Sequence, residues 1–328
     1  MISFCQIGAG RIGRIHAENI ALHPRARLAT VVDVDREAAK ALAKRHGAAA
    51  GELDAALADP AIDAVLISSS TETHAALVER AARAGKAVFC EKPLDLDRRR
   101  AAACVAVAAE CGVALMVGFN RRFDPNFARL HEQLRAGRIG PLEILSLTSR
   151  DPAPPPPAYL KVSGGLFRDM MIHDFDMARW LLGEEPVELF AAASCKVDPE
   201  IGRLGDVDTA LVTLRTASGV LCQISNSRRA AYGYDQRIEA FGAEGMLRAK
   251  NVVESTLEFS GAHGIVTEKP LHFFLERYAA AYRRELDHFV TAVEEGTEPI
   301  AGGEDGLKAL ALADAAVRSW ASAAPVKL

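Results

Sequence analysis

Short apolar runs and longer amphipathic stretches alternate along the first 119 residues. The runs are hydrophobic at nearly every position and lie at Ile2–Ile7, Leu28–Val32, Ala64–Ile67, Ala87–Cys90 and Val113–Val117. The stretches between them have helical spacing and end near Leu22, Gly47, Gly85 and Gly112. Because strands that are apolar throughout are buried on both faces, this pattern predicts a parallel sheet with helices on both sides.

Beyond Gly118 the pattern changes to shorter runs with more alternation. Helical spacing recurs at 125–136, 171–182, 273–295 and 306–321, and strand-like runs occur at 142–148, 187–193, 209–215, 220–225, 236–241, 246–250 and 255–259. Alternation indicates strands with one buried face, so this half predicts an α+β domain with a large, open, mostly antiparallel sheet. The proline run at 152–157 suits neither a helix interior nor a central strand, which predicts a stiff loop.

The length of the chain predicts two domains, because 328 residues exceed what one hydrophobic core usually supports. We expect an α/β protein with a doubly wound Rossmann domain at 1–120 and a second domain at 121–328. The last helices of the second domain could pack back on the first.

Charge and hydropathy argue against several classes of protein. The formal net charge is −4, with both signs mixed along the chain, which disfavours a dedicated nucleic-acid binder. No apolar run approaches the ~20 residues of a membrane-spanning helix, and no basic segment precedes the apolar start. The six cysteines form no CxxC pair. We therefore expect a cytoplasmic protein that binds neither nucleic acid nor membrane.

A glycine motif directly follows the first predicted strand. Its residues are Gly8, Ala9, Gly10, Arg11, Ile12 and Gly13, which fit G-x-G-x-x-G before a helix. Such a loop brings backbone N–H groups and a helix N-terminus to a pyrophosphate. Asp33 ends the next apolar run, 20 residues after Gly13, where a carboxylate accepts hydrogen bonds from an adenosine ribose. Together these features predict a dinucleotide-binding site.

Asp33 also bears on the choice between NAD and NADP. A 2′-phosphate at ~4 Å from this carboxylate would be repelled by roughly 4 kcal/mol at an effective dielectric constant near ~20. Arg36 could offset part of that repulsion, whereas Asp35 would add to it. We therefore expect NAD as the cofactor.

Polar residues follow the next two runs, where the predicted sheet meets the cofactor. Ser68 and Ser69 end the third run and His74 opens the following helix. These three residues are candidates for cofactor contact, with ordinary loop and helix-cap roles as the alternative. Glu91 and Lys92 follow the fourth run in the same way.

Further motifs complete the pattern. Glu91–Lys92–Pro93 is followed by GFNRRF at Gly118–Phe123, and the second half contains DMMIHDFD at Asp169–Asp176 and YGYD at Tyr232–Asp235. In this order and spacing the chain resembles the Gfo/Idh/MocA oxidoreductase family over nearly its whole length, and its second half is similar to the inositol 2-dehydrogenase branch. The resemblance implies a Rossmann domain, a second domain for substrate binding and oligomerisation, and a homodimer or homotetramer.

The resemblance also implies roles for individual residues. Lys92 matches a lysine that contacts both the nicotinamide ribose and the substrate hydroxyl. Asp169 and His173 match a D-x-x-x-H pair in which the histidine is the candidate general base. The implied substrate-side residues are Arg121 and Tyr234. Asp151 is a further candidate for substrate binding, in a stretch that departs from the family pattern. The implied reaction is NAD-dependent oxidation of a cyclitol, above all of myo-inositol to 2-keto-myo-inositol (scyllo-inosose).

The residue types suit this chemistry independently. Oxidation of an alcohol removes a proton while hydride leaves the carbon for the nicotinamide. A histidine, with an ordinary pKa near ~6.5, accepts that proton near neutral pH, and a lysine cation stabilises alkoxide charge. Asp169 and His173 are four residues apart, a spacing that on a helix places two residues on one face. This chemistry requires no metal.

Other interpretations stay open at this point. The segment Ser149–Pro152 departs from the inositol pattern, so scyllo-inositol, a glucose-like pyranose or an anhydrosugar are alternative substrates. The D-x-x-x-H spacing also fits a zinc site, although no third ligand is evident, or a simple helix-stabilising pair. A non-catalytic NAD sensor is a further alternative. It would need no proton-transfer residues, so Lys92, Asp169 and His173 argue against it.

Overall fold

The computed structural model describes all residues, 1–328, which divide into two compact units. Unit 1 comprises Met1–Phe123 and Ala281–Leu310. Unit 2 comprises Asp124–Ala280 and Ala311–Leu328. A late segment of the chain therefore belongs to the same unit as the N-terminus.

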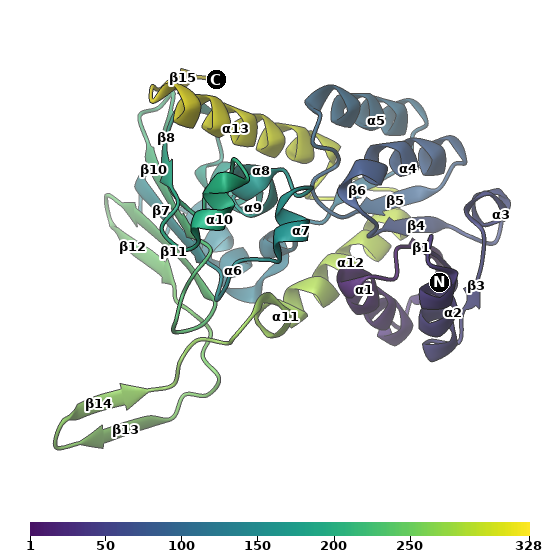
Figure 1. The fold of residues 1–328 in the computed structure, drawn as a ribbon, viewed down its shortest axis with the longest axis horizontal. Helices are drawn as coiled ribbons and strands as arrows, with labels where there is room; N and C mark the ends of the chain where they lie inside the picture. The colour runs from purple at the N-terminus through teal and green to yellow at the C-terminus, as the bar shows by residue number, and fades with distance from the viewer. The chain divides into compact units, whose positions relative to one another are not determined.

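Unit 1 contains a six-stranded parallel sheet in the order β3-β2-β1-β4-β5-β6 (Figure 1). Its strands are β1 (Ile2–Ile7), β2 (Ala26–Val32), β3 (Ala49–Ala50), β4 (Ala64–Ile67), β5 (Ala87–Cys90) and β6 (Leu115–Val117). All six residues of β1 are buried, as expected for a strand that is covered on both faces. The strand order reverses at β1 and β4, and open α/β sheets bind ligands beyond the carboxyl ends of the strands at such a point.

Helices cover both faces of this sheet. The helical elements of unit 1 are α1 (Arg11–Leu22), α2 (Arg36–Arg45), α3 (Leu53–Ala58), α4 (Thr71–Arg83), α5 (Arg98–Glu110), the 3₁₀ turn η1 (Asn120–Phe123), most of α12 (Ala279–Glu295) and the start of α13 (Gly303–Ser322). Figure 1 shows α4 and α5 on one side of the strands and α1 and α12 on the other. Phe289 of α12 packs against Phe4 of β1 and Phe89 of β5, with ring centroids 5.9 and 5.6 Å apart. The core of unit 1 thus includes a C-terminal helix.

The predicted parallel sheet is confirmed. The strands β1, β4 and β5 have the expected bounds, and α2, α4 and α5 are followed by Gly47, Gly85 and Gly112, all with positive φ. The helix α4 begins at Thr71, so His74 lies within its first turn rather than at its first residue. The elements β3 and α3 were not expected, because two and six residues are too few for a clear hydrophobic period.

Unit 2 contains a seven-stranded sheet in the order β12-β11-β7-β10-β9-β8-β15. Its strands are β7 (Leu142–Arg150), β8 (Pro186–Ser194), β9 (Thr209–Thr216), β10 (Leu221–Ser227), β11 (Asp235–Gly242), β12 (Gly245–Ala249) and β15 (Val326–Lys327). Only β7 and β10 pair in parallel, which confirms the predicted mostly antiparallel sheet. Burial alternates along β9, so one face of the sheet is open.

The helices of unit 2 include several short ones. They are α6 (Pro125–Arg135), α7 (Pro157–Leu160), α8 (Gly165–Asp169), α9 (Ile172–Leu182), α10 (Pro199–Arg203), α11 (Phe274–Arg277) and the part of α13 (Gly303–Ser322) beyond Leu310. The proline run forms no helix or strand up to Pro156, as predicted, and Pro157 is the first residue of α7. Proline suits that position because its missing N–H has no partner there. The helix expected at 273–295 is interrupted at Tyr278.

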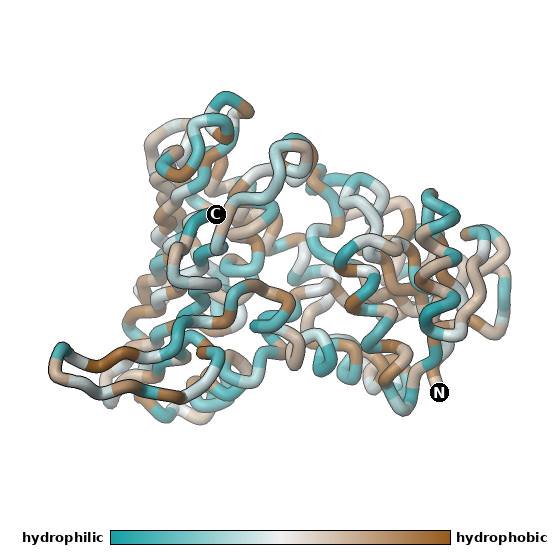
Figure 2. The backbone as a smooth tube through the Cα atoms, turned by 60° about the horizontal axis from the view of Figure 1, so that its bottom comes forward, coloured by the Kyte–Doolittle hydropathy of each residue, from teal (hydrophilic) through white to brown (hydrophobic).

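A hairpin of two short strands, β13 (Glu258–Gly261) and β14 (Gly264–Thr267), forms its own sheet in unit 2. The sequence predicted one strand at 255–259 instead. Apolar side chains of the hairpin are about two-thirds exposed; they are Leu257, Phe259, Ile265 and Val266. Figure 2 shows hydrophobic segments along both of its strands.

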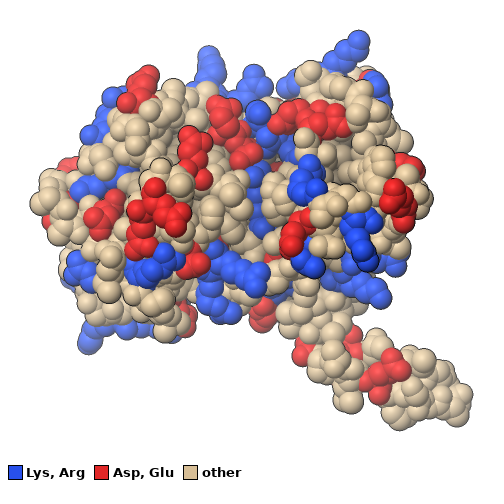
Figure 3. Space-filling model, turned by 180° about the vertical axis from the view of Figure 1, so that it is seen from behind, with Lys and Arg blue, Asp and Glu red and all other residues tan.

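The surface mixes both charges (Figure 3), and the thiols are unpaired. No helix combines the length and the apolar character needed to cross a membrane. On the face seen in Figure 3, acidic and basic side chains are interspersed. All six cysteines are free, and burial raises the pKa of Cys5 to about 12.

Candidate active site

In the glycine loop between β1 and α1, two of the three glycines lie directly against other parts of the protein backbone. Gly8 has a φ of 106°, and a Cβ there would lie 2.6 Å from the backbone of Ser68. A Cβ on Gly13 would lie 2.2 Å from the carbonyl oxygen of Gly8. A Cβ on Gly10 would meet nothing within 4 Å. Two glycines therefore allow close contact within the protein, while the third leaves an open side for a ligand.

Gln6 supports this loop from inside the sheet. Its side-chain Nε2 donates hydrogen bonds to the carbonyl oxygens of Gly8 and Gly13, at 2.9 and 2.6 Å. The residue is fully buried. Sequence reasoning missed this role, although a single glutamine in an apolar strand was the available signal.

Arg11 is exposed at the start of α1, and Ile12 is half-buried.

Asp33 lies directly after β2 and is bonded to the same loop. Its Oδ2 accepts the N–H of Ala9 at 2.6 Å, and its Oδ1 accepts the N–H of Asp35 at 2.8 Å. A carboxylate has about four lone-pair sites, so it retains acceptors for ribose hydroxyls. Arg36, which could have offset repulsion of a 2′-phosphate, is paired with Glu52 at 2.8 Å. The open position at Gly10 and the acceptors of Asp33 fit a dinucleotide such as NAD.

The side chains after β4 are bonded within the protein. The hydroxyl of Ser68 donates to the carbonyl oxygen of Ile7 at 3.2 Å. The buried imidazole of His74 lies 2.8 Å from the carbonyl oxygen of Pro93 through Nδ1 and 3.1 Å from that of Ser69 through Nε2. His74 therefore links the segment after β4 to the segment that carries Lys92.

Lys92 follows β5 by two residues and is half-buried. Its peptide bond to Pro93 is cis. The preceding residue, Glu91, is buried, and its Oε1 lies 2.7 Å from Nε2 of His16. Arg121 lies in η1 and is 5% exposed. These residues belong to unit 1, together with the glycine loop and Asp33.

Asp169 and His173 belong to unit 2, and their local structure corrects the sequence-based prediction. Asp169 is the last residue of α8, whereas His173 is the second residue of α9. Between the helices, the N–H of Met171 bonds to the carbonyl oxygen of Leu166, five residues back, at 2.9 Å. The expectation that both residues lie on one continuous helix is wrong, because this wider turn interrupts the helical spacing.

Two residues that sequence reasoning missed contact the carboxylate of Asp169. The hydroxyl of Tyr159 donates to Oδ1 at 2.8 Å, and the guanidinium of Arg228 donates to Oδ2 at 3.4 Å. Arg228 is 1% exposed and also lies 4.0 Å from Oδ2 of Asp206. Tyr159 lies in α7, directly after the proline run, so this loop brings a side chain to Asp169.

The remaining substrate-side candidates also lie in unit 2. Tyr234 is 6% exposed, and its ring packs edge-on against Tyr278 at 5.9 Å. Its N–H donates to the carbonyl oxygen of Leu271 at 3.0 Å. Asp151 is half-buried, and its N–H donates to the carbonyl oxygen of Ser227 at 3.0 Å.

One group of buried side chains in unit 1 could supply ligands to a metal. His16, Glu91 and Glu285 each offer one ligand atom, and these atoms lie within 4.8 Å of one another. None of these side chains was considered as a metal ligand on sequence grounds, because they are distant along the chain.

Comparison with known proteins gives the family. The profile described as an oxidoreductase family with an NAD-binding Rossmann fold matches residues 2–119, and the profile of the GFO/IDH/MocA C-terminal domain matches residues 127–248. A protein from Rhizobium meliloti named inositol 2-dehydrogenase is 52% identical over 98% of this chain and 97% of its own length. The chain belongs to the GFO/IDH/MocA oxidoreductase family. The resemblance stated from the motifs is therefore confirmed.

Two further relatives within this family are similar over almost their whole length. A myo-inositol 2-dehydrogenase from Thermotoga maritima is 48% identical over 98% of this chain and 97% of its own. The crystal structure of scyllo-inositol dehydrogenase from Lactobacillus casei, with bound NAD(H) and scyllo-inositol, is 30% identical, with a TM-score of 0.92 and coverage of 100% and 99%. As a GFO/IDH/MocA member with an NAD-binding Rossmann fold, the chain is an NAD-dependent oxidoreductase.

Proposed function

We propose that this chain is an NAD-dependent inositol 2-dehydrogenase that oxidises myo-inositol to 2-keto-myo-inositol (scyllo-inosose). The observation that carries this proposal is the similarity of almost the whole chain to the inositol 2-dehydrogenases of Rhizobium meliloti and Thermotoga maritima. A second candidate substrate is scyllo-inositol, because a relative of the same fold has been crystallised with it.

The cofactor is held by residues of unit 1. Backbone N–H groups of Gly8–Gly13 receive the pyrophosphate at the N-terminus of α1, with Arg11 and Ile12 lining the loop. Asp33 accepts the adenosine ribose hydroxyls. Ser68, Ser69, His74 and Glu91 would border the bound cofactor. Bound there, NAD supplies a hydride acceptor.

Lys92 acts on the substrate oxygen. Its ammonium group donates a hydrogen bond to the reacting hydroxyl and stabilises the alkoxide charge that develops as hydride leaves the carbon. Its half-buried position supports this role, because a partly desolvated cation interacts more strongly with that charge.

His173 is the general base that takes the hydroxyl proton, and Asp169 orients it. An imidazole suits this step because it exchanges protons near neutral pH. The carboxylate of Asp169 is itself held by Tyr159 and Arg228, which supports a fixed orientation rather than a mobile surface group. Arg121, Asp151 and Tyr234 bind the remaining hydroxyls of the ring. No step requires a metal.

The protein assembles as a homodimer or homotetramer through the open face of the unit 2 sheet, and it works in the cytoplasm. A cross-strand row of apolar side chains supports this assembly. Met246 pairs with Phe241, Phe241 with Ile144, and Ile144 with Leu221, and each of the four is 44–45% exposed. Apolar side chains gathered on an exposed face are typical of protein–protein contacts. A Phe241→Glu variant should lower the mass measured by light scattering.

The experiment that tests the function is a substrate panel. Purified protein is assayed for NADH formation with myo-inositol, scyllo-inositol, glucose and an anhydrosugar, and kcat/KM is compared among them. The proposal expects the highest value for myo-inositol. A clearly higher value for scyllo-inositol would support the second candidate, and turnover of the sugars alone would contradict both.

A further inference from the structure

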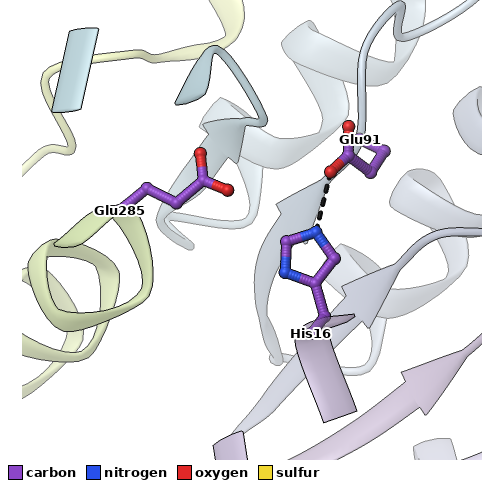
Figure 4. A group of neighbouring side chains, drawn as sticks. All are labelled: His16, Glu91 and Glu285. Atoms are coloured by element: carbon purple, nitrogen blue, oxygen red, sulfur yellow. Dashed lines mark hydrogen bonds and ion pairs between the residues drawn. The ribbon is translucent and has the colours of Figure 1, made fainter. Parts of the chain in front are cut away.

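Three buried titratable side chains gather next to the residue that precedes Lys92. They are His16 on α1, Glu91 directly after β5 and Glu285 on α12 (Figure 4). One polar atom from each lies within 4.8 Å of the other two. All three belong to unit 1, and the function described so far assigns no chemistry to His16 or Glu285.

The carboxylate of Glu91 is confined on two sides. Its Oε1 bonds to Nε2 of His16 at 2.7 Å, and the His16 ring is itself packed edge-on against Phe89 and Tyr282. On the other side, a Cβ on Gly118 would lie only 2.9 Å from Oε2 of Glu91. The position of Glu91, and of the backbone that continues into Lys92, therefore depends on this packing.

Glu285 differs from Glu91 in having no hydrogen-bond partner. Its exposed fraction is 0%, and both of its carboxylate oxygens are buried without a donor or acceptor. Figure 4 shows its carboxyl group on the side of the α12 helix that faces Glu91 and His16. Burial raises the pKa of Glu285 well above its ordinary value, and the negative charge of Glu91 adds to this effect. An ionised carboxylate in such a place would be strongly unfavourable, and the neutral acid is much less so.

We propose that Glu285 is a neutral carboxylic acid in the folded protein, and that it and His16 are positioning residues that hold Glu91, and through it Lys92, in place. The titratable groups that face Glu285 come from two other elements, His16 of α1 and Glu91 after β5, and Tyr282 of its own helix lies against the His16 ring. The part that concerns Lys92 rests on the proposed function.

The protonation state is tested by thermal unfolding against pH, which needs no substrate. A glutamate that is neutral when folded and ionised when unfolded destabilises the protein as pH rises above its unfolded pKa of 4.5. Glutamine is neutral at every pH and has nearly the same shape. The Tm of Glu285→Gln relative to the native protein should therefore increase from about pH 5 to about pH 8, by roughly 3 °C or more.

Glu295→Gln alters an exposed residue of the same helix and is the matched control. Its Tm relative to the native protein should not increase with pH. A Tm difference that falls with pH would mean that Glu285 is ionised and paired, which overturns the proposal. A loss of Tm in the native protein on treatment with a chelator, abolished by Glu285→Gln, would mean that the cluster binds a divalent cation, and would overturn it as well.

The positioning role is tested by kinetics with the substrate that the panel selects. Glu285→Ala should lower kcat on the order of 10- to 100-fold and leave the KM for NAD within about 3-fold, because a small displacement of a reacting group affects the chemical step. Glu285→Gln should restore most of that kcat. Unchanged kcat in the alanine variant, with a lowered Tm, would show a purely structural role. If no cyclitol is oxidised at all, the proposed function fails, while the Tm trend still decides the state of Glu285.

Discussion

The carboxylate of Asp33 accepts the backbone N–H of Ala9 at 2.6 Å, which joins the end of β2 to the glycine loop. The other carboxylate oxygen, Oδ1, accepts the N–H of Asp35, the residue that caps α2. One side chain therefore positions the loop for the pyrophosphate and the acceptors for the adenosine ribose. A change at Asp33 should affect both the affinity for the cofactor and the choice of cofactor.

We predict that Asp33→Ala weakens NAD binding and lowers the preference for NAD over NADP. The ratio of the two kcat/KM values should fall by at least about tenfold, because the variant lacks both the ribose acceptor and the charge that repels a 2′-phosphate. Asp35→Asn is the control, since asparagine retains the helix cap while it removes a neighbouring charge. A native protein that uses NADP more efficiently than NAD would contradict this assignment.

Lys92→Ala should impair the chemical step and spare cofactor binding. We expect kcat to fall on the order of 10²–10³-fold, because one stabiliser of the alkoxide is lost. The Kd for NADH, measured by fluorescence, should change little, since the phosphates are held at Gly8–Gly13. Lys44→Ala, an exposed lysine on α2, is the matched control and should turn over normally. Near-normal turnover of Lys92→Ala would remove Lys92 from the mechanism.

His173→Ala should largely abolish oxidation, with a loss on the order of 10²–10⁴-fold, and should remove the limb of the pH–rate profile that reports the base. Asp169→Asn should lose much of the rate and retain the fold, because Arg228 still has Asp206 within 4.0 Å. Circular dichroism checks the fold. If the Asn variant unfolds while His173→Ala stays active, the pair is structural.

Asp208 offers a pH-dependent test of unit 2. Its buried carboxylate accepts the N–H groups of Lys196, Val197 and Asp198 at 2.7–3.0 Å. Burial raises the pKa of this carboxyl, but the three N–H groups and Thr209 outweigh burial, so the net shift is below the ordinary value of 3.8.

A lowered carboxyl pKa contributes stability that is present above pH 3.8 and lost as pH falls through the folded pKa. We therefore predict that Asp208→Asn reduces the free energy of unfolding by roughly 2–3 kcal/mol at neutral pH. The difference from the native protein should shrink in acid. Urea denaturation at several pH values measures it, and a difference that is constant down to strong acid would contradict the prediction.

The sheet of unit 1 and the glycine loop were predictable because their signals are local. A strand that is buried on both faces is apolar along its length, and the residues of the loop are adjacent in sequence. The alternating strands of unit 2 were predictable for the same reason. The hairpin of β13 and β14 was misplaced, because its exposed apolar residues show no regular alternation with polar ones.

The parts of the candidate site that could not be predicted depend on distant contacts. His16 and Glu91 are 75 residues apart, and Arg228 meets Asp169 across 59 residues. For His16 a signal did exist, because it shares the buried face of α1 with Gly13, Ala17 and Ile20. The short helix α8 had no such signal, because its five residues are too few for a clear hydrophobic period.

Isotope transfer shows whether hydride moves directly from C2 of myo-inositol to NAD. The native protein is incubated with NAD and myo-inositol that carries deuterium on C2, without added metal, and the NADH is analysed by mass spectrometry. Direct hydride transfer from C2 predicts that each NADH formed carries one deuterium and that the ketone product carries none at that carbon. NADH without deuterium, or no turnover of myo-inositol, would contradict the proposed reaction.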